Sequence, residues 1–307
     1  MNVKPASANT FLVILNPAAG GGRAGKRAPE VVDRLRGAGL EVEVRHTAAP
    51  GDGIELARQG FEEGYRNFIA GGGDGTAFEV LNGCLPPSLE SEDPVRMGFL
   101  PLGTGNAYLQ DFAKDLTAHT VGCLVDDRRR MTDVAVLRHR GGSHYFINLI
   151  GYGIPSEVTI KAAAAGLKRL GPIGYILAVF TTIAGLKHRD LPVHLDDGET
   201  FHGPTIQTTI SNSRYTANGM LIAPDAKLDD GKVDLVTIAP MGRLSVAWAF
   251  PSIFSGKHVE LDTIEARQSS VIHFDGDQEI DLMIDGEVRR VTPERVEVLQ
   301  NILEVWA

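Results

Sequence analysis

Short apolar runs alternate with amphipathic helical patterns through the first 130 residues. Strand-like runs lie at 11–17, 41–47, 66–73 and 96–103. Helical patterns follow them at 26–38, at 53–64 and in the segments TAFEVLNGCL and NAYLQDFA, where the last begins a helix. Strands that alternate with helices at this spacing predict a parallel sheet with helices on both of its faces.

The pattern changes near residues 128–132. From there on, most runs are short, β-branched and alternating, which predicts an antiparallel sandwich or barrel-like sheet. Helical stretches interrupt it at about 156–187 and 242–256. The sequence therefore predicts an α/β domain over residues 1–130 and a β-rich domain over 131–307. The predicted strands of the second domain are 131–139, 143–153, 191–197, 205–213, 232–240, 270–276, 279–288 and 295–307.

Composition narrows the class of protein. The net charge of −9 argues against an extended nucleic-acid surface, which needs a basic face. Two cysteines, Cys84 and Cys123, make no disulfide framework and suggest a reducing compartment. The N-terminal residues show no secretory signal and no run reaches the length of a membrane span, so we expect a cytoplasmic protein.

Glycine-rich loops follow three of the predicted strands, at 16–26, 71–76 and 101–106. Glycine reaches positive φ and lets a ligand approach the backbone. A loop that then opens a helix presents free N–H groups, which suits phosphate. One such loop would be weak evidence, but three at strand ends in one domain favour a phosphate-binding site.

Two familiar phosphate motifs fit these loops poorly. Gly20 to Lys26 matches G-x-x-x-x-G-K, but Arg27 stands where a P-loop has Ser or Thr. A different phosphate-proximal loop and a simple basic strand-to-helix turn both remain open for this segment. GTGNAY and GYGIPS lack the third glycine of a dinucleotide fingerprint, so nicotinamide redox chemistry is disfavoured.

The loop IAGGGDGT, residues 69–76, places a single acid among glycines. A carboxylate beside amides that face phosphate would repel the ligand unless a divalent cation lay between them, which points to Mg²⁺–nucleotide chemistry. The alternative is a turn aspartate that accepts hydrogen bonds from its own backbone.

Four segments together resemble the diacylglycerol kinase/sphingosine kinase catalytic family, in its bacterial soluble lipid kinase form. They are NPAAGGGRA from Asn16, GGDGTxxEVLNG from Gly72, PLGTGN from Pro101 and IDGE from Ile284, in the family's order over essentially the whole chain. GGDGT alone is shared with NAD kinases and loosely with phosphofructokinases. The resemblance implies a phosphofructokinase/NAD-kinase-like three-layer α/β domain that binds ATP, a β-rich lipid-substrate domain, and an active site between them. It is also compatible with packing of the extreme C-terminus against the first domain.

The resemblance also implies roles for single residues. Asp74 would act through Mg²⁺ and its waters, and Glu287 would be the general base that takes the proton of the lipid hydroxyl. A second, structural Mg²⁺ is implied at the turn KLDDGK, held by the Asp230 side chain and the carbonyls of Lys227 and Lys232. The implied ATP contacts are Asn16, Thr47, Gly72, Gly73, Asp74, Gly75, Thr76, Ala77, Phe78 and Thr104.

Two features qualify this match. Many diacylglycerol kinases have Asp after G-T-[AG]-N, whereas Ala107 stands here, and the G-T-G-N-A form leans toward sphingosine and ceramide kinases. From the residues alone, Asp285-Gly286 is a hairpin tip, so only the family match makes Glu287 catalytic. A second D-G-E, residues 197–199, is interpreted as a simple hairpin.

The apolar run 173–186 is too short to span a bilayer. Its basic flanks suit an interfacial helix on anionic lipid, and a buried helix of the β-rich domain is the alternative, which could coexist with docking. The flanking residues are Lys161, Lys168, Arg169, Lys187, His188 and Arg189.

The leading hypothesis is an ATP- and Mg²⁺-dependent kinase of a neutral lipid, with diacylglycerol as acceptor and phosphatidic acid as product. It would work in the cytoplasm, peripherally on the inner face of the membrane, and without nucleic acid. A homodimer is compatible with the sequence but not specified by it. The alternatives are a sphingosine, ceramide or other lipid kinase, a soluble-substrate kinase of the NAD kinase type, and a non-catalytic lipid- or nucleotide-binding protein.

Overall fold

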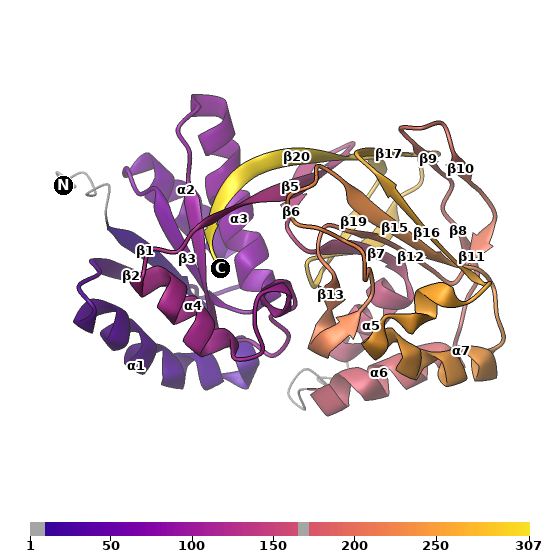
Figure 1. Cartoon of the computed structure of the whole chain (residues 1–307), viewed down its shortest axis with the longest axis horizontal. Coiled ribbons are helices and arrows are strands. Elements are labelled where there is room, and N and C mark those ends of the chain that lie inside the picture. The colour runs from indigo at the N-terminus through magenta and orange to yellow at the C-terminus, as the bar shows by residue number, and fades with distance from the viewer. Residues whose placement is uncertain (1–9, 165–171) are drawn as a thin grey trace. The chain divides into compact units, whose positions relative to one another are not determined.

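The computed structural model describes residues 10–164 and 172–307 and divides into two compact units (Figure 1). The first contains the chain up to Thr132 together with Asn301–Ala307, and the second contains Asp133–Gln300. The first unit is α/β and the second is rich in antiparallel strands. The predicted fold class is therefore confirmed.

The first unit is built on a parallel sheet. Its strands lie in the order β2 (Val42–His46), β1 (Phe11–Leu15), β3 (Asn67–Gly72) and β4 (Arg96–Pro101). Residues 304–306, at the end of β20 (Pro293–Trp306), pair with β4 in the same direction. β3 is buried at every position, as expected of a central strand covered on both faces.

Helices cover both faces of this sheet (Figure 1). α1 (Arg23–Gly37) and α4 (Leu116–Val125) share one core with side chains of alternate strand positions, among them Val13 and Leu15 of β1. α2 (Asp52–Glu62) and α3 (Asp74–Ser91) pack together on the opposite face. There Gly60 of α2 lies against Leu12 of β1. The alternation of side chains along each strand thus produces the three layers.

One predicted helix of this unit was wrong. Residues 106–113 do not begin a helix but contain only the 3₁₀ helix η2 (Tyr108–Asp111), and the next α-helix is α4. Asn106 has a φ of 49°, in the left-handed region, which a right-handed helix does not contain.

The second unit contains a six-stranded antiparallel sheet in the order β16-β15-β12-β7-β18-β19. A further set of strands, β10-β9-β17-β20, also pairs antiparallel, and β5 pairs with β20 and β6. The first sheet consists of β16 (Ile264–Ser269), β15 (Val233–Ile238), β12 (Gln207–Ser211), β7 (Leu149–Gly153), β18 (Ile280–Ile284) and β19 (Glu287–Val291). The other strands are β5 (Arg130–His139), β6 (Gly142–Phe146), β9 (Val193–Leu195), β10 (Thr200–Phe201) and β17 (Val271–Phe274), with the short pairs β8 (Arg189–Asp190) and β11 (Pro204–Thr205), and β13 (Tyr215–Thr216) and β14 (Met220–Leu221).

The helices of the second unit lie together against the sheets (Figure 1). α5 packs on β7 and on α6, and α6 packs on α7. They are α5 (Ile154–Ala164), α6 (Pro172–Ala184) and α7 (Arg243–Ala249), and α7 continues into the 3₁₀ helices η5 (Phe250–Ser255) and η6 (Lys257–Glu260).

The predicted single strand at 143–153 is in fact two strands in different sheets. β6 pairs with β5, whereas β7 pairs with β12 and β18, and the chain bends at Ile147 and Asn148 between them. The buried carboxylate of Asp285 stabilises this bend. It accepts hydrogen bonds from the backbone N–H groups of Ile147 (3.0 Å), Asn148 (3.0 Å) and Leu149 (2.9 Å). A side chain far away in the sequence therefore terminates the strand.

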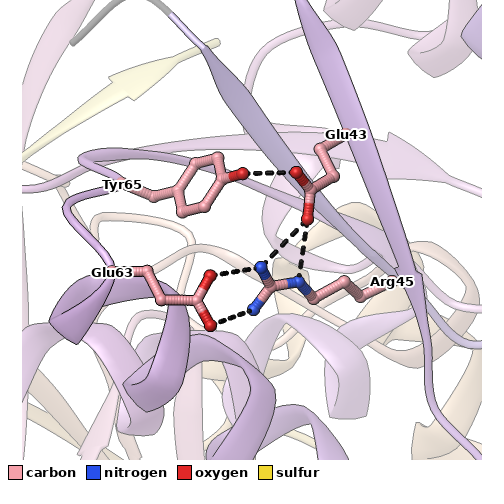
Figure 2. Close-up of polar contacts among 4 residues, drawn as sticks. All are labelled: Glu43, Arg45, Glu63 and Tyr65. Carbon is pink, nitrogen blue, oxygen red and sulfur yellow. Dashed lines mark hydrogen bonds and ion pairs between the residues drawn. The ribbon is translucent and has the colours of Figure 1, made fainter. Parts of the chain in front are cut away.

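A polar cluster fastens the edge strand β2 to the end of α2 (Figure 2). The guanidinium of Arg45 lies 2.5 Å from Glu63 and 2.9 Å from Glu43, and the hydroxyl of Tyr65 donates to Glu43. Burial and the hydrogen bond to Glu43 raise the pKa of Tyr65 to about 12. Charged side chains on an edge strand also discourage pairing with another chain.

We expect Asp285→Ala to lower the free energy of unfolding by about 3 kcal/mol or more, because three backbone donors around a buried acceptor lose their partner together. Urea denaturation measures the change. Asp277→Asn, at an exposed acid three residues before the strand pair, is the control and should stay within about 0.5 kcal/mol of the wild type. Equal stability of the Asp285→Ala and control variants would contradict this role.

Candidate functional site

The carboxyl ends of the parallel strands bring the predicted nucleotide contacts to one edge of the first unit's sheet. Leu15 of β1 pairs in register with Gly71 of β3 and with His46 of β2, and Gly72 pairs with Pro101 of β4. The three glycine-rich loops and Thr47 follow directly after these positions. Ligands of open α/β sheets bind at this edge.

Backbone hydrogen bonds tie these loop beginnings to each other. The N–H of Asn16 donates to Gly71 O (2.9 Å), and that of Thr47 donates to Leu15 O (2.9 Å). The N–H groups of Leu102 (2.9 Å) and Gly103 (2.8 Å) both donate to the carbonyl of Gly72. The loops are therefore one connected structure rather than independent turns.

The first loop is a run of left-handed residues at the start of α1. Gly20, Gly21 and Gly22 have φ values of 61°, 70° and 87°. A Cβ on Gly20 would lie 2.8 Å from the carbonyl oxygen of Leu102, so this loop also touches the third loop. Successive turns of this kind expose backbone N–H groups, a geometry suited to anions.

The second and third loops meet backbone to backbone. A Cβ on Gly103 would lie 2.4 Å from the Cα of Gly73, and a Cβ on Gly72 would lie 2.2 Å from the hydroxyl oxygen of Thr76. No side chain fits at these distances, because real Cβ atoms essentially never come within 3.0 Å of another heavy atom. The close approach explains Gly72 of GGGDGT and Gly103 of PLGTGN.

Asp74 holds this approach together. It is the first residue of α3, and its Oδ1 accepts a hydrogen bond from the N–H of Ala107 at 2.7 Å. A Cβ on Gly105 would lie 2.8 Å from its Oδ2. The third loop therefore bends around the carboxylate, a role that the sequence alone did not reveal.

The electrostatics at Asp74 favour a nearby cation. Part of its surface is exposed, but protein atoms surround the carboxyl closely, and this desolvation raises its pKa. Backbone N–H groups of Ala107, Asp74 itself, Tyr108 and Asn106 oppose the rise by stabilising the charged form. A divalent cation would stabilise it further, so the residue fits the predicted contact with Mg²⁺.

A small pocket adjoins the carboxylate. Gly72, Gly73, Asp74 and Asn106 line it, together with Phe99, Tyr108 and other residues of β3, β4 and η2, and its volume is about 20 Å³. This is room for about one water molecule or ion. Of the other predicted ATP contacts, Thr104 is exposed, Asn16 is half-buried, and Thr76, Ala77 and Phe78 are buried in the first turns of α3.

Several motif residues have structural roles. The carboxylate of Glu79 accepts hydrogen bonds from Gly51 N (2.7 Å) and Gly53 N (3.0 Å) at the start of α2. A Cβ on Gly83 would lie 2.2 Å from the carbonyl oxygen of Ile54, so the glycine of LNG permits α2 and α3 to pack closely. The fixed spacing within GGDGTxxEVLNG is the signal from which these roles could have been found.

In the second unit, the two acids of the D-G-E at residues 285–287 differ: one is buried and structural, and the other is accessible. Asp285 and Gly286 form the left-handed turn between β18 and β19, with φ values of 45° and 87°. Asp285 is buried, as described above, whereas Glu287, the first residue of β19, keeps part of its surface exposed. The other D-G-E, residues 197–199, is the predicted hairpin, between β9 and β10.

The turn KLDDGK lies directly before β15. Asp230 accepts a hydrogen bond from Lys232 N at 3.1 Å, and Asp133 accepts one from Gly231 N at 2.7 Å. Burial, and then repulsion by Asp230 and Asp225, raise the pKa of Asp234 to about 7. Excess negative charge suits a cation, but no three His, Cys, Asp or Glu side chains of the described residues could hold one. A metal at this turn would also need carbonyl ligands such as those of Lys227 and Lys232.

An apolar pocket of about 90 Å³ lies within the second unit. Side chains of α5, α6, α7 and η5 line it, opposite strands β7 and β12. The resemblance implied a β-rich lipid-substrate domain here but not that helices supply much of the wall of an apolar pocket. The helix lining includes Val158, Val179, Ile183, Val246, Phe250 and Ile253.

The predicted interfacial helix corresponds to α6. Ala178, Val179 and Ile183 are buried on one side, whereas Ile176, Leu177 and Phe180 are exposed on the other. The predicted flanking residues Lys168 and Arg169 lie outside the described residues. No helix within 10–164 or 172–307 has the length and apolar character needed to cross a bilayer.

Known proteins resemble both parts of the chain. Residues 10–137 match the family model of the diacylglycerol kinase catalytic domain. Residues 148–307 match the model of the YegS C-terminal NAD kinase beta sandwich-like domain.

Curated relatives and solved structures agree with these matches. A diacylglycerol kinase of Staphylococcus saprophyticus is 27% identical over 299 residues, which cover 96% of this chain and 94% of the relative. Its namesake in Staphylococcus haemolyticus is 26% identical over 298 residues, or 95% of this chain and 86% of the relative. The crystal structure of a candidate diacylglycerol kinase from Bacillus anthracis str. Sterne has a TM-score of 0.78 and 26% identity, and the match covers 99% of this chain and 97% of that one. The chain therefore belongs to the diacylglycerol kinase family of lipid kinases.

Proposed function

We propose that the protein transfers the γ-phosphoryl group of ATP to the hydroxyl of diacylglycerol, giving phosphatidic acid and ADP. The observation that carries this proposal is the edge at which three glycine-rich loops meet around the Asp74 carboxylate. The family membership and the apolar pocket of the second unit support a lipid acceptor.

In the proposed mechanism the loops bind the nucleotide. Backbone N–H groups of the first loop and of the start of α3 would donate to phosphate oxygens. Asp74 would hold Mg²⁺ or its waters. Bound Mg²⁺ neutralises charge on the β- and γ-phosphates, which is its contribution to phosphoryl transfer.

Glu287 would act on the acceptor. It would take the proton of the lipid hydroxyl as that oxygen forms a bond to the γ-phosphorus and the bond to the bridging oxygen of ADP breaks. Its partial exposure leaves the carboxylate accessible, whereas the neighbouring Asp285 is committed to three backbone donors. Positioning carries most of the catalysis of phosphoryl transfer, so the placement of this carboxylate beside the acceptor hydroxyl is what the mechanism requires of it.

One feature of the sequence favours a lipid other than diacylglycerol as the acceptor. Ala107 is buried and its N–H donates to Asp74, so the family's aspartate at this position would have to fit in a buried place. The G-T-G-N-A form favours a sphingosine or ceramide kinase as the second candidate.

Radiolabelled ATP, offered with diacylglycerol, monoacylglycerol, phosphatidylglycerol, sphingosine and ceramide in mixed micelles, identifies the acceptor by the product that carries the label. No labelled lipid would refute the proposal.

The site of action follows from the acceptor. A diacylglycerol lies within a bilayer, so the protein would work at the inner face of the membrane, as a peripheral protein without bound nucleic acid. The turn KLDDGK would add a structural Mg²⁺ in the second unit. Self-association into a homodimer is compatible with this function but not required by it.

Asp74→Asn should lower turnover by about a hundredfold or more with little loss of stability. The amide keeps an oxygen that can accept the hydrogen bond from Ala107 N, so the loops stay joined, but it loses the negative charge for a metal. Asp74→Ala should lose both turnover and thermal stability. Transfer of label and thermal melts measure the two effects separately. An Asp74→Asn variant as active as the wild type would limit Asp74 to holding the loops.

Glu287→Gln should lower kcat by about two to four orders of magnitude while leaving the dissociation constant of ATP unchanged, because only proton removal is lost. Glu199→Gln, in the hairpin D-G-E, removes the same charge from a similar turn and should leave kcat unchanged. Initial rates at saturating lipid and a nucleotide-binding titration make the comparison. If the two variants had the same kcat, Glu287 would not be the base.

A further inference from the structure

α7 exposes two large apolar side chains almost completely. Leu244 is 87% and Trp248 is 82% exposed. They lie four residues apart and therefore on the same side of the helix. A tryptophan this exposed is unusual for a surface in contact only with water, because it gives up the burial of a large apolar area.

The exposed apolar surface extends beyond α7. Phe254 of η5 and Ile176, Leu177 and Phe180 of α6 are also exposed. Rings connect the helices, because Phe180 lies 6.2 Å from Phe250, and Phe250 lies 5.8 Å from Phe254, between ring centroids. We call this surface the apolar helix face, defined by Ile176, Leu177, Phe180, Leu244, Trp248 and Phe254.

The two segments that carry this face contain basic residues and no acidic ones. Segments 172–189 and 241–259 contain no Asp or Glu, although the whole chain has a net charge of −9. They contain the exposed cations Lys187, Arg243 and Lys257. Cations on the same segments as exposed apolar and aromatic side chains match the anionic headgroups and the hydrocarbon boundary of a bilayer.

The inner sides of the same helices line the apolar pocket. Val179 and Ile183 of α6 and Val246 of α7 line it, while Phe180, Leu244 and Trp248 are exposed. The same helices thus offer apolar surface to solvent and to the pocket. A bilayer in contact with the exposed side could supply a lipid chain to the pocket on the inner side, which a second protein chain would not do.

We infer that the apolar helix face of α6, α7 and η5 rests in the surface of an anionic bilayer, with Trp248 and Leu244 inserted. This inference rests on the proposed function only in that the acceptor is a lipid. It extends the docking surface from α6, which the sequence indicated, to α7 and η5, which supply the most exposed side chains.

Tryptophan fluorescence gives a direct test, because the chain has only two tryptophans. Trp306 is 2% exposed and donates to Asp127 at 2.9 Å, so a spectral change on adding lipid would come from Trp248. Vesicles of phosphatidylcholine with phosphatidylglycerol should shift the emission to the blue, and brominated lipids should quench it. Trp248→Phe should abolish both responses. An emission spectrum unchanged by vesicles would overturn the inference.

Sedimentation with the same vesicles tests the face as a whole. Leu244→Glu with Trp248→Glu should lower the fraction bound by about tenfold or more. Val125→Glu places one glutamate at an exposed apolar residue of α4 and should bind as the wild type does. Equal binding of all three proteins would overturn the inference, as would a wild-type dimer that the double variant converts to monomer without a change in vesicle binding.

An assay with short-chain diacylglycerol in detergent micelles separates this inference from the proposed function. The double variant should phosphorylate that acceptor at the wild-type rate, because no bilayer has to be reached. A double variant that is inactive there and has a lowered melting temperature is misfolded. The fluorescence responses of the wild type and the single Trp248→Phe variant to vesicles then decide whether the face docks on the bilayer. Vesicle binding by a wild type that phosphorylates no lipid would refute the proposed function and leave the docking face standing.

Discussion

The Asp74 carboxylate and the contact of Gly73 with Gly103 control the geometry of the first unit's loops. The backbones of the second and third loops meet there without side chains between them, and the Asp74 carboxylate at the start of α3 holds the third loop in place. Burying that carboxylate costs free energy, which the backbone N–H groups of the third loop offset in part. A site with amides for phosphate and a desolvated negative charge is suited to a metal–nucleotide complex.

Within the same motif, some residues stabilise the fold and neighbouring residues face the candidate site. In GGDGTxxEVLNG, Asp74 faces the loops, whereas Glu79 secures the beginning of α2 and Gly83 allows close helix packing. In the late D-G-E, Asp285 holds a bend between two sheets, and Glu287 remains accessible. Each of the helices α6 and α7 has one side that lines the pocket and another side that is exposed to solvent.

Much of this arrangement could be predicted from the sequence, because the strand and helix periods are clear and the glycine-rich loops follow the strands. The adjacency of the loops follows from parallel pairing. The sequence could not predict contacts between distant residues. The bend at Ile147 depends on Asp285, and the missing helix after Asn106 depends on a left-handed residue beside Asp74. The exposure of Trp248 also required the structure, because a short apolar helix has the same composition whether it is buried or exposed.

Hydrogen exchange of backbone amides, measured with and without Mg²⁺ and ATP, tests directly whether the nucleotide binds at the edge where the three loops meet. If the nucleotide binds at this edge, exchange should slow in the first unit within residues 16–26, 71–78 and 101–108, the loops that meet at the strand ends. Protection should weaken in Asp74→Asn if the carboxylate holds the metal. Protection confined to other segments of the first unit, or none at nucleotide concentrations that saturate the wild-type kinase, would contradict the assignment of this edge as the nucleotide site.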